Sequence, residues 1–256
     1  MEDIRYPDEL KNILLGMKLK EDDIGKSTSK VLRYYDDQKA YYLKIQANAE
    51  IIREAQILDW LKGKLPVPEI MYYDFYEGYG YLLLAEIEGQ ILSSSYYLNR
   101  PEEPVKLLAD GIKILQSISI DNCSFDARLD RKLEIALNNI KNNLVDIADW
   151  EEDNKFSSPV ELFIYLKNNR PKNQTLSFTH GDYTLANILG KGSRISGFID
   201  WGRGGVADIY QDIALAVRSL KHKFNTDKYI DLFFKYLDTE PDWERINYYI
   251  LLDELF

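Results

Sequence analysis

The chain has a single cysteine, Cys123, among its 256 residues. One thiol cannot form a disulfide within the chain, and the lack of disulfides is typical of proteins from reducing compartments. The apolar runs are all far shorter than the roughly 20 residues that a membrane-spanning helix needs. The acidic first segment, MEDIRYPDELKNILL, lacks the basic and then apolar pattern of a signal peptide. We therefore expect a cytoplasmic protein with no membrane partner.

Basic residues are outnumbered, with 32 Lys and Arg against 42 Asp and Glu and a formal net charge of -10. A general nucleic-acid-binding protein needs a basic face, so this balance argues against a nucleic-acid partner. A negative field favours encounters with cations, although many proteins are acidic simply for solubility. Hydrophobic residues make up 45% of the chain, which suffices for a sizeable core in one large or two small domains.

The N-terminal part reads as a small, mostly antiparallel sheet with one inserted helix, because period-two and period-3.6 patterns alternate there. The predicted elements are a helix over 8–17, strands over 31–37 and 40–46, a helix over 48–63, and a hairpin over 70–89 with Gly78 and Gly80 at its turn.

After Gly89 the pattern becomes mainly helical. The predicted elements are helices over 104–119, 126–148, 159–169, 208–223, 226–237 and 241–256, a strand over 176–179, and a hairpin between 187 and 200. The sequence therefore predicts an α+β fold in two parts, residues 1–88 and residues 89–256. Clefts between two such parts are favoured sites for ligands.

Three side chains that can bind a metal fall in one short stretch, THGDYTLANILGKGSRISGFIDWG. Asn187 and Asp200 lie at opposite ends of the predicted hairpin, and a hairpin returns its ends to each other. A carboxylate and an amide oxygen suit Mg²⁺. Asp182, five residues before Asn187, would lie beside the metal and accept a proton from an attacking hydroxyl. Singly, such residues are common in turns, but the full set on a hairpin favours a catalytic site.

The pattern H-G-D-x-x-x-x-N followed by I-D-W-G resembles the catalytic and metal loops of the aminoglycoside phosphotransferases, relatives of the protein kinases. The resemblance covers nearly the whole chain and is closest to the aminoglycoside 3'-phosphotransferases of the broad-spectrum type from Gram-positive cocci. It is carried further by REAQILDWLKGKLPVPEI, WEEDNKF, SGFIDWGR and PDWERINYYILLDELF. It implies a protein-kinase-like two-lobed fold, with a nucleotide-binding lobe over 1–88, and ATP-dependent phosphorylation of a sugar hydroxyl. The second lobe, 89–256, would hold the catalytic loop, the metal site and the aminoglycoside-binding surface.

A kinase-like N-terminal lobe needs a strand lysine on the nucleotide phosphates and a helix glutamate that holds it. The strand AYYLKI offers Lys44, and Tyr42 shares its face because side chains alternate along a strand. The helix offers Glu54, three residues after Ile51 and four before Leu58, where an unpaired carboxylate would be costly. We therefore expect a Lys44–Glu54 ion pair.

The resemblance implies a role for each of these residues. Asp182 is the catalytic base, Asn187 and Asp200 are magnesium ligands, and Lys44 contacts the phosphates. The implied nucleotide contacts are completed by Tyr42 stacking on adenine, Ser27 in the loop over the phosphates, and the main chain of Ala85 and Ile87 at the adenine edge. ATP is the implied cofactor, with GTP as an alternative. We expect His180 to hydrogen-bond the loop backbone.

An aminoglycoside carries several ammonium groups, so its site is expected to be acidic. The candidate residues are Asp149, Glu151 and Glu152 between helices, and Glu254 with the Phe256 carboxylate at the end of the last helix, where negative charge opposes the helix dipole. Arg203 is also a candidate substrate-binding residue, and we expect it to contact either phosphate or an acidic partner. The sequence departs from the family pattern at two places that bear on the substrate range: His222-Lys223 stands where the family has an acidic pair, and Ala148 stands where it has a carboxylate.

Two further functions remain open. One is a kinase of the same fold for another hydroxylated substrate, such as choline or a macrolide. The other is an inactive nucleotide-binding module, which the presence of Lys44, Asp182 and Asp200 argues against. A monomer and a homodimer are equally compatible with the sequence.

Overall fold

The computed structural model describes residues 5–21, 30–46, 50–151 and 154–256 and divides the chain into two compact units. Unit 1 is Met1–Gly89 with Ser196–Gly202, and unit 2 is Gln90–Ile195 with Arg203–Phe256. The segment 196–202 was predicted to belong to the C-terminal part. It joins unit 1 because the Phe198 N–H donates to the Pro66 carbonyl at 2.9 Å and Asp200 contacts a strand of the sheet there.

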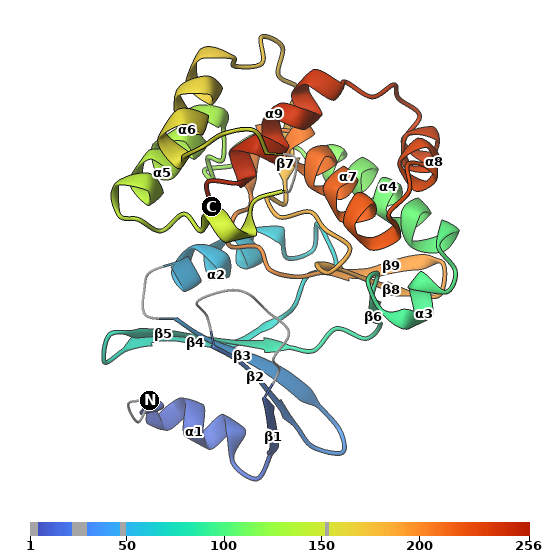
Figure 1. The fold of residues 1–256 in the computed structure, drawn as a ribbon. Helices are drawn as coiled ribbons and strands as arrows, with labels where there is room; N and C mark the ends of the chain where they lie inside the picture. Colours follow the sequence, from blue (N-terminus) through green and yellow to red (C-terminus); the bar gives the residue numbers. More distant parts are fainter. Residues whose placement is uncertain (1–4, 22–29, 47–49, 152–153) are drawn as a thin grey trace. The chain divides into compact units, whose positions relative to one another are not determined.

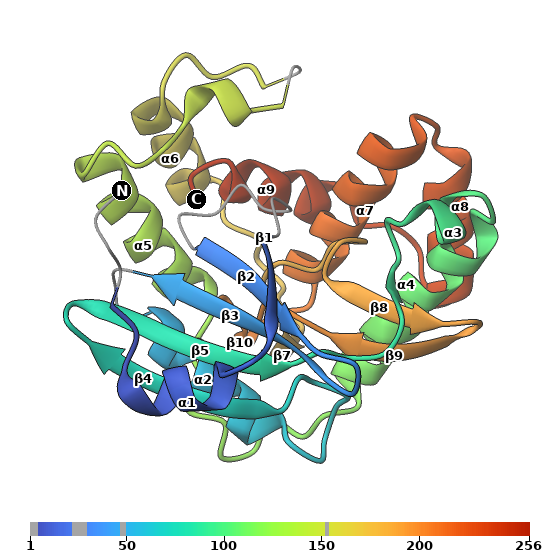
Figure 2. The ribbon, with the colours of Figure 1, turned by 90° about the horizontal axis from the view of Figure 1, so that it is seen from below.

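Unit 1 is built on an antiparallel sheet with strand order β1-β2-β3-β5-β4 (Figure 2). Its strands are β1 Lys18–Glu21, β2 Lys30–Tyr35, β3 Ala40–Gln46, β4 Ile70–Tyr76 and β5 Tyr79–Ala85. Strand β1 was not predicted, because its sequence KLKE is mostly charged and lacks the alternation of apolar and polar residues that indicates a half-buried strand.

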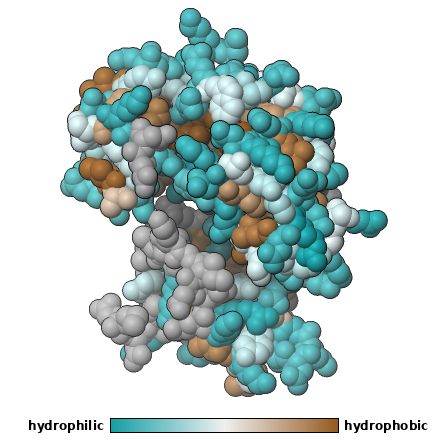
Figure 3. Space-filling model, turned by 45° about the vertical axis from the view of Figure 1, so that its right-hand side comes forward, coloured by the Kyte–Doolittle hydropathy of each residue, from teal (hydrophilic) through white to brown (hydrophobic). Residues whose placement is uncertain are grey.

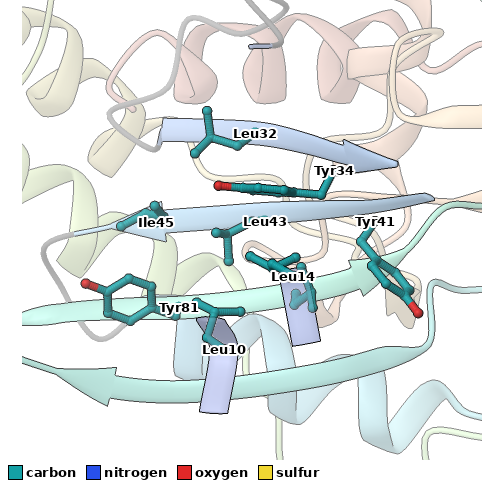
Figure 4. Close-up of a cluster of buried hydrophobic side chains, with 9 residues drawn as sticks. Leu10, Leu14, Leu32, Tyr34, Tyr41, Leu43, Ile45 and Tyr81 are labelled. Carbon is teal, nitrogen blue, oxygen red and sulfur yellow. The ribbon is translucent and has the colours of Figure 1, made fainter. Parts of the chain in front are cut away.

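The two faces of this sheet are covered by different helices. Helix α1 (Asp8–Leu14) packs on one face and helix α2 (Glu50–Leu61) on the other (Figure 1). Alternate residues of β3 point toward α1 and are buried with Leu10 and Leu14 (Figure 4). The intervening residues of β3 therefore point toward α2, which is the face that carries the predicted lysine.

The hairpin between β4 and β5 turns one step earlier than predicted. Glu77 and Gly78 both have positive φ angles, 49° and 84°, which is the requirement of a tight two-residue turn that matches the twist of the strands. Gly80 lies inside β5 instead of in the turn.

Unit 2 is mainly helical (Figure 1). Its helices are α3 Ser95–Leu98, α4 Glu102–Gln116, α5 Leu129–Lys141, α6 Pro159–Asn168, α7 Tyr210–Phe224, α8 Lys228–Leu237 and α9 Trp243–Asp253, with a 3₁₀ turn at Ile147–Asp149. Its strands are β6 Gln90–Ile91, β7 Leu176–Thr179, β8 Ile188–Lys191 and β10 Gly205–Asp208, and β9 Arg194–Phe198 begins in it. Helix α7 packs on α9, and α4 packs on α8.

The helix predicted over 126–148 is shorter in the structure. It begins at Leu129 and ends at Lys141, after which Asn143 takes a left-handed conformation with φ 55°. Asparagine tolerates this region better than most residues, so NNIKNN stops the helix where its apolar periodicity alone would continue it.

On the face seen in Figure 3, hydrophilic residues cover most of the described surface, and hydrophobic residues occur in separate patches. Among the helices of the described residues, none combines the length and the hydropathy that crossing a membrane requires.

Candidate active site

The loop that follows β7 is held by a buried carboxylate of α7. Asp212 accepts the backbone N–H of His180 at 2.7 Å and that of Gly181 at 2.9 Å. Asp212 and His180 are both fully buried. Burial raises the pKa of Asp212 to about 7, while the two N–H groups favour its ionised form. The loop backbone is thus fixed by a side chain that lies 32 residues after His180 in the sequence.

Gly181 has to be glycine at this position. Its φ is +80°, and a Cβ atom there would lie 2.2 Å from the Arg203 carbonyl oxygen. The strand-to-loop turn therefore depends on a close approach of two backbones in unit 2, which a side chain would prevent.

Asp182 and Asn187 lie together, as their spacing predicts. The Asn187 amide nitrogen donates to the Asp182 carbonyl at 2.9 Å and to the Asp182 carboxylate at 2.9 Å. The amide group of Asn187 is thereby oriented with its donors toward Asp182, which leaves its oxygen as the atom with which it can bind a cation. The prediction for His180 is confirmed, since its Nδ1 accepts the Asp182 N–H at 3.3 Å.

The Lys44–Glu54 ion pair predicted in unit 1 is present. The Lys44 ammonium lies 2.6 Å from Glu54 Oε1 and 3.0 Å from Asp200 Oδ1. Burial by itself lowers the pKa of Lys44, but the two carboxylates outweigh it and raise that pKa above its ordinary value. The lysine is thus charged, held from two sides, and suited to bind phosphate.

Asp200 differs from Glu54 in its exposure. The Glu54 side chain is only 6% exposed, whereas that of Asp200 is 51% exposed. Asp200 also has a positive φ of 66°, a strained conformation that is concentrated at functional sites. Its carboxylate can therefore reach a ligand from solvent while it remains tied to Lys44.

The predicted adenine contacts lie on and beside β3. Tyr42 shares a face with Lys44 and is paired in register with Arg33, whose guanidinium forms an ion pair with Glu86 at 2.7 Å. The Ala85 N–H donates to the Glu69 carbonyl, so its own carbonyl is the group that could meet adenine. Ile87 is half-buried and packs against Gly197. Ser27 lies outside the described residues.

The predicted metal ligands are on elements that the hairpin prediction identified. Asn187 directly precedes β8, Asp200 follows β9, and the two strands are neighbours in a sheet. No group of three or more His, Cys, Asp or Glu side chains suited to a metal occurs in the described ranges. Mg²⁺ does not need one, because it commonly takes one or two protein oxygens together with water and substrate phosphates. The amide oxygen of Asn187 and the carboxylate of Asp200 are each of a donor type that Mg²⁺ accepts.

One of the acids predicted to bind substrate, Glu151, is paired with basic residues of unit 2. Glu151 contacts His222 at 2.7 Å and Arg218 at 3.9 Å. Arg218 also pairs with Asp253. Asp149 is exposed in its 3₁₀ turn, and Glu152 lies outside the described residues. A cationic substrate would therefore have to compete with the His222 and Arg218 side chains for Glu151.

The C-terminal residues are attached to the acidic segment. The Trp150 indole N–H donates to the Glu254 carbonyl at 2.8 Å, and the Glu151 N–H donates to the Glu254 carboxylate at 3.2 Å. Burial raises the pKa of Glu254 to about 7. Arg203 meets an acidic partner, since it pairs with Asp253 at 3.3 Å, and its guanidinium lies over the Phe256 ring.

Sequence reasoning missed two residues at this site. Asp212 carried a signal, because it stands among buried apolar residues in the first turn of α7. Lys132 carried another, since it lies three residues after Leu129 and four before Ala136, on the buried stripe of α5. A charged residue on such a stripe calls for a partner or a function.

Comparisons with known proteins agree with this architecture. The sequence matches the phosphotransferase enzyme family over residues 18–249. It is 37% identical to an aminoglycoside 3'-phosphotransferase of Enterococcus faecalis, with 100% of both chains covered. The crystal structure of an aminoglycoside-3'-phosphotransferase of type VIII has a TM-score of 0.87 at 25% identity, covering 97% of both chains. An aminoglycoside phosphotransferase of Streptomyces rimosus in complex with ADP and streptomycin has the same fold, with a TM-score of 0.77 at 23% identity, covering 93% of this chain and 92% of that one.

An antiparallel sheet with an ion-paired strand lysine, followed by a helical unit with an H-G-D loop, defines a phosphotransferase of the kinase-like class. The chain belongs to the phosphotransferase enzyme family. The predicted α+β, kinase-like fold and the resemblance to the aminoglycoside 3'-phosphotransferases are thereby confirmed.

Proposed function

We propose that this enzyme transfers the γ-phosphoryl group of ATP, or alternatively GTP, to a hydroxyl of an aminoglycoside, with the 3'-hydroxyl as the acceptor. The observation that carries the proposal is the Asp182–Asn187 pair in the H-G-D loop, because phosphoryl transfer needs a carboxylate beside an oxygen ligand for the metal. The full-length similarity to an enterococcal aminoglycoside 3'-phosphotransferase supports the choice of substrate, and with it a role in antibiotic resistance.

Each unit supplies one part of the chemistry in this proposal. In unit 1, Lys44 binds the phosphates, Tyr42 stacks on the base, and the main chain of Ala85 and Ile87 meets the adenine edge. In unit 2, Asp182 orients the acceptor hydroxyl and receives its proton. The proposed ligands of Mg²⁺ are Asn187 in unit 2 and Asp200 in unit 1, and the ion when bound would neutralise charge on the transferring group. The role of residues 1–88 as the nucleotide-binding part belongs to the same proposal.

The substrate-binding part of the proposal rests on Asp149, Glu151, Glu152, Glu254, Arg203 and the Phe256 carboxylate. Charge supports it, because acids near a helix C-terminus are favoured when a cation compensates them. His222 stands where the family has an acidic pair, and in this chain it contacts Glu151. We therefore expect a substrate that places fewer ammonium groups at this point than an acidic pair would bind.

The experiment compares the wild type with Asp182→Asn, using release of ADP in the presence of kanamycin and, separately, nucleotide binding. We expect turnover to fall by at least about 10³-fold while nucleotide binding persists, because only the proton acceptor is lost. Asp231→Asn, an exposed carboxylate on α8, is the matched control. Retained turnover in Asp182→Asn would contradict the base assignment.

A substrate panel decides the acceptor. Kanamycin is compared with an aminoglycoside that lacks the 3'-hydroxyl, with choline and with a macrolide. Turnover confined to drugs with a 3'-hydroxyl supports the proposal, and turnover of choline or the macrolide alone would replace it with the small-molecule kinase alternative. ATP binding without turnover of any substrate would indicate an inactive module.

A further inference from the structure

A buried lysine of unit 2 has no part in the proposed chemistry. Lys132 on α5 is only 7% exposed, and it makes no hydrogen bond or ion pair with any residue that the structure describes. Burying an ammonium group without an acceptor costs free energy. Burial accordingly lowers the pKa of Lys132 to about 8, which leaves it mostly charged near neutral pH. Because burial of this charge lowers the stability of the fold, we expect Lys132 to have a specific role.

The Lys132 ammonium lies over the ring of Phe256. Lys132 Nζ is 4.9 Å from the centre of the Phe256 ring, and the Arg203 guanidinium carbon is 5.5 Å from the same centre. Both distances are within the range of cation–π attraction, which is stronger when the cation is desolvated. Two cations from separate segments of unit 2 therefore face one aromatic ring.

The ring and the ammonium border a small pocket next to the catalytic loop. The pocket holds about 20 Å³, and Lys132, Phe256, Asp253 and Gly181 are among its lining residues. That volume is near the size of one water molecule. Gly181 is the neighbour of Asp182, so Phe256 lines the same pocket as the backbone of the loop that carries the proposed base.

The same helix holds the chain end by a second contact. The Asn139 side chain donates to the Leu255 carbonyl at 2.9 Å. Asn139 is seven residues after Lys132, two helical turns along α5 on the same face. Leu255 itself is fully buried. Helix α5 thus contacts Leu255 through the hydrogen bond of Asn139 and Phe256 through the cation–π contact of Lys132.

We propose that Lys132 is a positioning residue that holds the Phe256 ring beside the catalytic loop, so that the terminal α-carboxylate is presented to an ammonium group of the substrate. The part that concerns the substrate rests on the proposed function, whereas the placement of the ring does not. A carboxylate fixed in advance binds a cation more tightly than one on a mobile chain end, because less conformational entropy is lost on binding.

The placement of the ring is tested without substrate. Purified variants are treated with carboxypeptidase A, and release of Phe256 is followed by intact-protein mass spectrometry. We expect Lys132→Met to release Phe256 about 5- to 10-fold faster than the wild type, as loss of a desolvated cation–π contact implies. Lys132→Arg keeps the charge, and Lys141→Met removes an exposed lysine from the same helix, so both are expected to behave as the wild type does. An unchanged release rate in Lys132→Met would overturn the proposal.

The presentation of the carboxylate is tested by kinetics. In Lys132→Met, KM for kanamycin is expected to rise about 5- to 10-fold, while KM for ATP and kcat stay close to the wild-type values. In Lys132→Arg, which keeps the charge, KM for kanamycin is expected to equal that of the wild type. An unchanged KM for kanamycin, or an equal rise in KM for ATP, would overturn the role toward substrate. Phe256→Leu tests the same contact from the other side should Lys132→Met not fold, and the double variant is expected to be no worse than either single variant.

Failure of the proposed function gives a different result. A wild-type enzyme that turns over no aminoglycoside would contradict the proposed substrate, and the carboxypeptidase comparison would still decide whether Lys132 holds the ring.

Discussion

The Asp212 carboxylate accepts the His180 backbone N–H at 2.7 Å, with both residues buried in unit 2. This contact connects the first turn of α7 to the loop that carries Asp182. A buried carboxylate that receives N–H groups fixes a loop more firmly than turn geometry alone, because both oxygens become unsatisfied if the loop moves.

Replacing Asp212 by asparagine is expected to disturb the loop with little effect on the fold. Asparagine has only one acceptor oxygen, so its NH₂ group would face either the His180 or the Gly181 N–H. We expect kcat to fall by about 10²-fold, since small displacements of catalytic groups have effects of that size. Steady-state kinetics with a far-UV circular dichroism spectrum check this, and an unchanged kcat would show that the loop holds its position without the carboxylate.

Gly181→Ala tests the close approach to Arg203. Gly181 and Gly63 have similar φ angles of +80° and +77°, but a Cβ atom at Gly63 would meet nothing within 4 Å. We expect Gly63→Ala to lower the free energy of unfolding by about 1 kcal/mol and Gly181→Ala by more than about 3 kcal/mol, because only the second adds a steric overlap with backbone. Urea unfolding measures both, and equal losses would contradict the overlap.

The Lys44–Glu54 pair predicts that two harmful changes partly cancel in stability. Lys44→Met leaves the buried Glu54 carboxylate without its cation and is expected to lower the free energy of unfolding by about 3 kcal/mol. Glu54→Gln combined with Lys44→Met removes the unpaired charge, so the double variant is expected to regain most of that stability. Both variants are expected to lack turnover, because the lysine proposed to bind phosphate is gone. A double variant less stable than Lys44→Met would argue against the unpaired-charge explanation.

Lys132→Met is expected to make the protein more stable. The pKa of Lys132 is lowered to about 8, below the value of about 10.4 for an unfolded lysine, so the unfolded chain binds more protons between those pH values. The free energy of unfolding of the wild type therefore increases as the pH rises from about 8 to about 10.4. Below that range Lys132 is charged in both states, and burial of the charge lowers the free energy of unfolding. We expect Lys132→Met to raise the free energy of unfolding at pH 7 by about 1–3 kcal/mol and to remove that rise with pH. Urea unfolding at about pH 7 and about pH 10 checks both, and a less stable variant at pH 7 would contradict a costly buried ammonium.

Much of the site could be predicted because its signals are local. The alternation in AYYLKIQ places Tyr42 and Lys44 on one face of β3, and the spacing around Glu54 turns it toward that face, so the ion pair followed from two short patterns. Asp182 and Asn187 are five residues apart, so the loop that contains both is enough to bring their side chains together.

The residues that were missed act at long range. Asp212 holds a loop about 30 residues away, and Lys132 meets a ring at the far end of the chain. The pairing of Glu151 with His222, which changes the expectation of an open acidic surface, joins residues of different elements. Local periodicity shows that such side chains point inward, but not which partner they find there.

The sequence by itself determined the alternation of strands and helices and their two-part order, and it indicated the residues that we propose to carry the chemistry, because periodicity and motif spacing are properties of neighbouring residues. Only the tertiary structure decided that residues 196–202 belong with unit 1, that Asp212 binds the loop before Asp182 and that Lys132 lies over the Phe256 ring. These features depend on contacts between distant segments, which form only when burial of the core brings those segments together.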